Sequence, residues 1–190
     1  KLAGTLSNGS LNVDSHVGLI DVAGSLGGAG DSLLINGNLK TLRVGTSKAA
    51  ALDGANLALD LTIIGDANTV EITGRADGTI TIAGNVNKFG VHADVVTAGT
   101  TILTEDVQIF GAAKNLAFSG GDVGGKIGLG LDIGKFELMN GDLLASAVVS
   151  STFGNIGPAT IRSGDVFGGF RAQNGLIKSI SVLGSDLGGA

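Results

Sequence analysis

Apolar and polar residues alternate along short runs of this chain, and most runs stop at a glycine that precedes a small polar or acidic residue. In the segment 79–83, Ile80 and Ile82 lie on one face and the threonines on the other, as in a β-strand. The same phrase recurs at 19–25, 33–38, 61–66, 70–74, 80–85, 107–111, 116–120, 136–142, 161–165 and 180–185. Each phrase predicts one short strand and one turn, and no single phrase can bury its apolar side alone.

The spacing of these phrases predicts a repeat architecture. Neighbouring phrase glycines, such as Gly74 and Gly84 or Gly164 and Gly175, are separated by the length of one short strand and one turn. Two or three phrases would complete a coil of roughly 20–30 residues, and stacked coils would bury the apolar faces together. The sequence therefore predicts an all-β fold, a single-domain parallel β-helix (β-solenoid) covering residues 1–190 in about 7–9 coils. Parallel crossovers favour the right-handed form.

Segments that do not follow the alternating phrase predict loops, turns and short helical segments. The long interval 37–65 predicts a degenerate phrase or a loop insertion, and the segments 47–52 and 143–147 allow a turn or two of helix. Glycine permits the positive φ of a tight corner, and the Asp, Asn or Ser that follows it is typical of turns. The seven phenylalanines, Phe110, Phe118, Phe136 and Phe153 among them, are predicted to stack along the core.

Composition narrows the class of protein. The chain has 34 Gly, one Pro and no Cys, and 43% of its residues are hydrophobic. Collagen needs a strict glycine period with abundant proline, and a disordered chain lacks this many apolar residues. The absence of cysteine excludes disulfides and thiolate metal sites. No apolar stretch reaches the ~18 residues of a membrane span.

The net charge is −5, and the 12 basic residues are scattered singly along the sequence. Because phosphate binding needs clustered Lys and Arg, this pattern argues against nucleic acid. The chain opens at Lys1 without a signal peptide, and neither end carries an obvious polar cap. We therefore expect a segment of a longer repeat protein, with further coils on either side or head-to-tail self-association.

Phrases of the form apolar-x-apolar-x-Gly-Asp/Asn-apolar resemble the parallel β-helix regions of large bacterial secreted and surface proteins. The nearest types are the autotransporter-passenger and filamentous-haemagglutinin-like families, and the resemblance covers nearly the whole chain. It implies an exported, right-handed β-helix that serves adhesion or forms a stalk. No diagnostic motif accompanies the resemblance, so it transfers an architecture and no site residue.

Few residues suggest chemistry. The segment 27–34 is similar to a calcium-binding nonapeptide repeat, which makes Asp31 the candidate ligand of a structural Ca²⁺ site. Asp31 lies one position earlier than the aspartate of that repeat, and no second copy of the repeat stands beside it in the sequence. His16 and His92 lack metal-site spacing and are predicted to be surface or turn residues. Glu105 and Asp106 are the only adjacent acidic pair, expected in an exposed turn. A threonine row for ordering ice does not recur in register. No catalytic or cofactor-binding residue is predicted.

The sequence thus predicts a structural or adhesive β-solenoid, a stalk, spacer or filament subunit of a bacterial surface protein, without enzymatic activity and with no resident cofactor. Its expected partners are copies or adjoining repeats of itself and cell-surface glycan. Two alternatives remain open: a carbohydrate-active enzyme (a polysaccharide lyase or hydrolase) and a glycan-binding module. A lateral groove that gathers three or more acidic residues would favour the enzyme.

Overall fold

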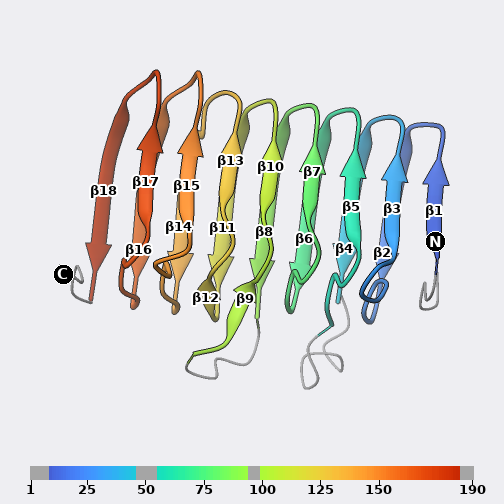
Figure 1. The fold of residues 1–190 in the computed structure, drawn as a ribbon, viewed down its shortest axis with the longest axis horizontal. Helices are drawn as coiled ribbons and strands as arrows, with labels where there is room; N and C mark the ends of the chain where they lie inside the picture. The colour runs from blue at the N-terminus through green and yellow to red at the C-terminus, as the bar shows by residue number, and fades with distance from the viewer. Residues whose placement is uncertain (1–8, 46–54, 94–98, 185–190) are drawn as a thin grey trace.

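The computed structural model describes residues 9–45, 55–93 and 99–184, and it shows a rod of stacked parallel strands (Figure 1). Each coil contributes one strand to each of two eight-stranded sheets. Sheet A contains β1 (Ser10–Val13), β3 (Ser32–Ile35), β5 (Asp60–Ile63), β7 (Ile80–Ile82), β10 (Val107–Ile109), β13 (Ile127–Leu129), β15 (Val148–Ser151) and β17 (Gly169–Ala172). Sheet B contains β2 (Val17–Val22), β4 (Leu39–Val44), β6 (Ala67–Thr73), β8 (Val86–His92), β11 (Ala113–Ser119), β14 (Phe136–Met139), β16 (Ile156–Arg162) and β18 (Ile177–Leu183).

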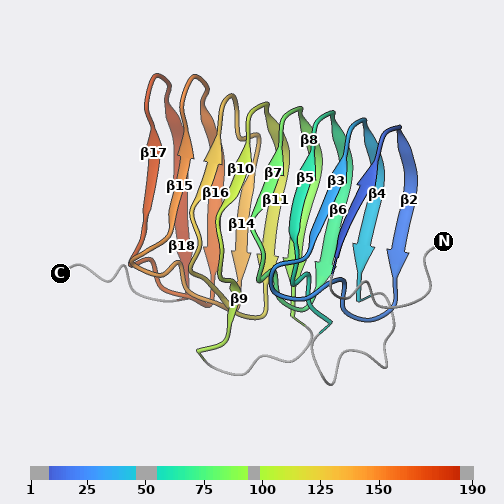
Figure 2. The ribbon, with the colours of Figure 1, turned by 45° about the vertical axis from the view of Figure 1, so that its right-hand side comes forward.

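A third, narrower side closes each coil. It is formed by the pair β9 (Thr101–Leu103) and β12 (Asp122–Val123) and by single paired residues on the other coils. Its ladder runs through Leu26, Leu57, Ala76, Leu103, Val123, Leu143 and Val166. Figure 2 shows the two main sheets facing each other along the length of the rod. The described residues contain no helix.

Strand register confirms the predicted repeat. Ser32 pairs with Asp60, and Leu61 in turn pairs with Ile80, so each phrase meets its counterpart on the next coil and the coils differ in length. The all-β solenoid of about seven turns is therefore as predicted. The long interval 37–65 contains β4 and the bridge residue Leu57 as well as residues outside the described part of the chain. The right-handed sense of the coil stays a prediction.

Helical turns were predicted as possible in two segments, 47–52 and 143–147. Residues 47–52 lie outside the described part of the chain. The prediction for 143–147 was wrong: Leu143 pairs with Val123 and Val166 in the third ladder, and the Ala147 N–H donates to the Leu144 carbonyl at 2.9 Å to close a turn. Pairing between coils satisfies the backbone here, so intrinsic helix preference does not decide the structure.

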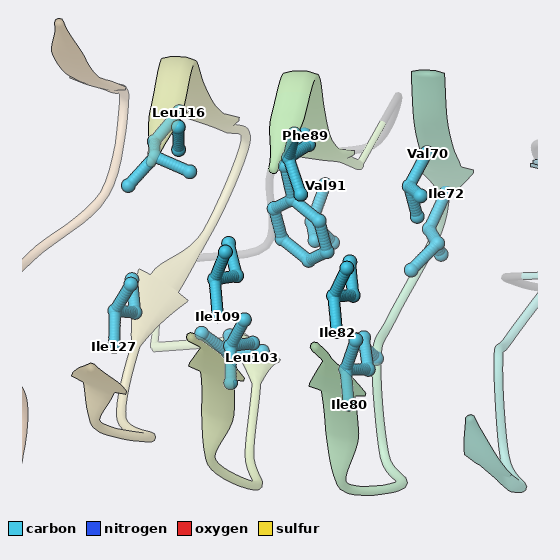
Figure 3. Packing of buried hydrophobic residues seen from close by; sticks show 14 of the residues in the cluster. Val70, Ile72, Ile80, Ile82, Phe89, Val91, Leu103, Ile109, Leu116 and Ile127 are labelled. Atoms are coloured by element: carbon cyan, nitrogen blue, oxygen red, sulfur yellow. The ribbon is translucent and has the colours of Figure 1, made fainter. Parts of the chain in front are cut away.

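The core lies between the sheets and is built by inward residues from Ile20 to Ile161, and Figure 3 shows part of it. Ile80 and Ile82 of sheet A are fully buried and point toward the side chains of sheet B. Phenylalanines stack along the axis: the ring centroids of Phe89 and Phe118 are 6.1 Å apart, and those of Phe118 and Phe136 are 5.6 Å apart. Contacts of this kind stabilise neighbouring coils beyond the area they bury.

Stacking was wrongly predicted for three phenylalanines. Phe110 is 59% exposed, Phe153 is 71% exposed and Phe167 is 49% exposed. Phe110 directly follows the inward-facing Ile109 at the end of β10, so strand alternation places it on the outside.

Three corners connect the sides of each coil, and the corner after sheet A does not use positive φ. After the strands of sheet B the chain adopts left-handed geometry at Gly45, Gly74, Gly120, Asn140, Ser163 and Gly184. The glycines after the strands of sheet A have no positive φ, and glycine is needed there because a side chain would have no room. A Cβ on Gly84 would lie 2.7 Å from the carbonyl carbon of Gly65 on the preceding coil. Close approach of successive backbones therefore explains the glycines at this corner, where positive φ was predicted.

Candidate functional site

The residues that follow the corner glycines of sheet A form a hydrogen-bonded ladder along the rod, here called the corner ladder. The Asn38 Oδ1 atom accepts the N–H of Asp66 at 2.9 Å, and the Asp66 Oδ1 atom accepts the N–H of Asn85 at 2.7 Å. Further steps join His16 to Asn38, Asn85 to Ala112, Asp132 to Asn155 and Asn155 to Leu176. Each side chain thus satisfies a backbone donor of the next coil, as a capping residue does for a helix.

At the two remaining corners, before sheet A and before the third side, acidic side chains also accept a backbone N–H of the next coil. Asp60 accepts the N–H of Thr79 at 2.9 Å, and Asp106 accepts that of Lys126 at 2.8 Å. At the third side, Asp122 accepts from Asp142 and Asp142 accepts from Asp165. Turn chemistry was predicted for Asp122, Asp142 and Asp165, and an exposed turn for Asp106. The structure adds that the bond joins two coils, so these carboxylates hold the stack together.

Asp31, the candidate calcium ligand, is buried and lies in the turn before β3. Its Oδ1 atom accepts the Gly9 N–H at 2.7 Å, and its Oδ2 atom accepts the Gly28 N–H at 2.8 Å. Both carboxylate oxygens therefore bind backbone donors from two coils. Within the described residues no group of three His, Cys, Asp or Glu side chains is placed to hold a metal ion. A structural Ca²⁺ site at Asp31 stays an untested prediction.

His16 and the adjacent acidic pair are exposed in turns, as predicted, whereas His92 is a half-buried strand residue. His16 is exposed in a turn, and its Nδ1 atom accepts the N–H of Asn38 at 2.8 Å. His92 ends β8 and contacts the Ser119 hydroxyl through Nδ1 at 2.9 Å. Glu105 and Asp106 are exposed before β10. The outward threonines Thr62 and Thr81 occupy the same register position on neighbouring strands. The next strand has Gln108 at this position, so the threonines do not form a continuous row.

Two shallow grooves cross the outer face of sheet B. The first has a volume of about 570 Å³ and lies beside the corner ladder. The second has a volume of about 510 Å³ and lies over β8, β11 and the start of β14. The first is lined by His16, Val17, Gly18, Asn38, Leu39, Lys40, Asp66, Ala67, Asn68, Asn85 and Asn87, and the second by Asn87, Lys88, Lys114, Asn115, Gly134 and Lys135. The only carboxylate in either lining is Asp66, which belongs to the corner ladder.

The second groove gathers lysines that are far apart in the sequence. Lys88, Lys114 and Lys135 come from three successive coils, and all three line it. Because the basic residues are scattered singly along the sequence, this cluster was not predicted. The signal that could have found them is the coil period, since the interval between Lys114 and Lys135 is close to one turn of the solenoid.

No family model matches the chain, and neither the curated proteins nor the solved structures contain a significant match. The β-solenoid architecture is therefore established from the coils themselves, and the likeness to autotransporter-passenger and haemagglutinin-like proteins stays a prediction. In the part of the chain that the structure describes, no helix has the length and hydropathy needed to cross a membrane.

Proposed function

We propose that this chain is a structural β-solenoid, a stalk, spacer or filament subunit that works by stacking end to end with further coils. The proposal places it outside the cell or at a bacterial surface, without enzymatic activity and with no resident cofactor. Support for the location comes from the resemblance of its phrases to bacterial surface β-helices. Support for the mechanical role comes from the rod itself.

Hydrogen bonding runs along the axis throughout the rod. Eight strands pair in parallel in each main sheet, and the strand spacing adds ~4.8 Å of length per coil. The corner ladder adds side-chain hydrogen bonds in the same direction. Because each coil contacts only its neighbours, further coils lengthen the rod without altering its cross-section. This is the property that a spacer requires.

The observation that carries the proposal is the apolar surface of the last described coil. Ile180 of β18 is 45% exposed, whereas Ala159 and Phe136, which occupy the same register position on earlier coils, are essentially buried. Ile177 is likewise 38% exposed, and its aligned residue Ile156 is buried. Another coil laid on this end would bury these side chains and pair the free edges of β17 and β18. That coil would come from an adjoining repeat or from a second copy.

Analytical ultracentrifugation of the chain across a range of concentrations tests the proposal. We expect concentration-dependent association, and we expect Ile180→Lys to abolish it, because the lysine places a charge on the surface that a further coil would cover. Ser181→Lys is the matched control, since it adds the same charge to the same strand at an outward position. Circular dichroism establishes that both variants fold. A wild-type chain that stays monomeric at every concentration contradicts end-to-end self-assembly, as does equal weakening by both variants.

A further inference from the structure

We propose that the outer face of sheet B binds an acidic, hydroxyl-rich polysaccharide, a polyuronate, along the rod axis. The binding surface, here called the lysine–asparagine track, comprises Lys40, Asn68, Asn87, Lys88, Lys114, Asn115 and Lys135. This inference concerns a lateral face and is independent of any association through the ends of the rod.

The track is continuous over several coils. Asn87 lines both grooves, so the two grooves are adjacent. Asn115 is level with Lys88 in the strand register, and the Lys135 carbonyl accepts the N–H of Leu116 next to it at 2.9 Å. Lys88, Asn115 and Lys135 therefore form one row, with about 4.8 Å between strands. The Asn87 amide also donates to Asn68 at 3.3 Å along the same direction.

The charge of this face is opposite to that of the whole protein. The chain carries a net charge of −5. The strands of sheet B nevertheless contain six basic residues, Lys40, Arg43, Lys88, Lys114, Arg162 and Lys178, against three acidic ones, Asp21, Glu71 and Glu137. Lys135 adds a seventh positive charge directly before β14, and Asp66 adds a fourth negative charge directly before β6. A linear anion lying along the axis would meet these groups from coil to coil.

Two of the track lysines already have carboxylate partners. Lys88 pairs with Glu71, and Lys135 pairs with Glu137 at 2.7 Å. Their side chains are 42% and 47% exposed, so water screens both pairs and a ligand carboxylate can take the place of the glutamate. For Lys114, the described part of the chain offers no ion pair. Its ammonium is therefore the group that we expect to bind a ligand anion at least cost.

Asn115 identifies the second requirement of the ligand. Its Oδ1 atom is buried and has no hydrogen-bond donor among the described residues, although it lies in the row between two lysines. Burying an acceptor without a donor is unfavourable, and a ligand hydroxyl supplies the missing donor once the flanking lysine side chains turn toward its carboxylates. A ligand with both carboxylates and hydroxyls satisfies the whole row.

Nucleic acid fits the track less well. The phosphodiester backbone of DNA has no hydrogen-bond donor to give to Asn115, and its dense charge would lie close to Asp66, Glu71 and Glu137. The lining of both grooves also contains no aromatic side chain of the kind on which bases stack in single-strand binding proteins, His16 at one end apart. A polyuronate carries one charge per sugar, which suits a surface where lysines alternate with amides.

Isothermal titration calorimetry at low salt with polygalacturonate tests the proposal, with neutral dextran and single-stranded DNA as comparison ligands. We expect binding to polygalacturonate, none to dextran and weaker binding to DNA. The triple variant Lys88→Gln, Lys114→Gln, Lys135→Gln is expected to lose at least about tenfold in affinity. Asn115→Asp, which places a negative charge in the row, is expected to weaken binding similarly.

Lys126→Gln is the matched control, because Lys126 is exposed and lies before β13 on sheet A. It is expected to bind within about twofold of the wild type. Thermal melting followed by circular dichroism checks that every variant is folded. Absence of binding, equal affinity for DNA, or equal loss in the Lys126→Gln control would overturn the proposal. Because no variant touches β18, the result is separate from that of the end-stacking experiment.

Discussion

Replacing Gly111 with alanine is expected to destabilise the solenoid, because the added methyl group has no space. Gly111 closely follows β10 and lies over Gly84 of the preceding coil. A Cβ at Gly111 would lie 2.6 Å from the Gly84 carbonyl oxygen and 2.7 Å from the Asn85 Oδ1 atom. Asn85 Oδ1 also accepts the Ala112 N–H at 2.9 Å in the corner ladder. Relieving the clash therefore moves two coils apart and lengthens a hydrogen bond between them.

The magnitude follows from two opposing effects. Inserting a methyl group into a close-packed site costs about 1–3 kcal/mol. The alanine also restricts the unfolded chain, which returns about 0.4–1 kcal/mol because Gly111 is not among the glycines with positive φ. The expected net loss is roughly 0–2.6 kcal/mol in the free energy of unfolding, and the loss relative to an alanine that meets no clash is about 1–3 kcal/mol. For a chain of 190 residues each kcal/mol lowers Tm by about 2–4 °C.

Urea unfolding followed by circular dichroism measures the effect, and Gly24→Ala is the matched control. Gly24 also lies in a turn and has ordinary φ, but no atom lies within 4 Å of its would-be Cβ. We expect this control to equal the wild type or to exceed it by up to about 1 kcal/mol. If Gly111→Ala proves as stable as Gly24→Ala, close backbone approach is not the reason for glycine at this corner. An unchanged m-value in both variants is needed for the comparison.

Two further substitutions test the corners. Asp66→Ala should lower the free energy of unfolding in urea by about 0.5–2 kcal/mol, because the N–H and the side-chain amide of Asn85 both lose their acceptor. Asp66→Asn keeps an acceptor oxygen and should stay within about 0.5 kcal/mol of the wild type. Equal losses in the two variants would exclude the corner ladder as the cause. Ser163→Gly should raise the thermal midpoint, with a gain of up to about 1 kcal/mol, because Ser163 has a φ of 55° at a corner where other coils place glycine. A lower midpoint would count against backbone strain there.

Strand positions and coil length could be predicted because they depend on a local pattern. In β5 and β7 the alternation of apolar and polar residues matches the observed burial position by position. The third side of the coil could not be predicted in the same way. Ala76 and Leu143 pair there as single residues, which is too short a contact for any periodicity to reveal. At Leu143 the apolar run was even interpreted as a possible helix.

The coil period could have suggested that the track lysines lie near one another, but their alignment in the lysine–asparagine track depends on strand register, which the sequence alone does not show. The interval from Lys88 to Lys114 is longer than the interval from Lys114 to Lys135. Coil length varies along the rod, so the offset that brings two residues level changes from one coil to the next. Asn115 shows the same difficulty, since its neighbours in the row, Lys88 and Lys135, become visible only once the strands are paired.

The contacts that hold the coils together involve only some of the side chains on the outer face of sheet B. Inward positions such as Ile72 and Val91 fill the core, glycines allow the backbones to approach, and the Asp and Asn side chains at the corners bond the next coil. Outward side chains such as Lys40 and Lys114 contribute to none of these. An acidic solenoid would stack equally well with any small polar residue at these positions. Ion pairs with Glu71 on a neighbouring coil account for Arg43 and Lys88. Among the described residues no ion pair accounts for Lys40 or Lys114 on a protein with net charge −5, and a ligand that runs along the axis would do so.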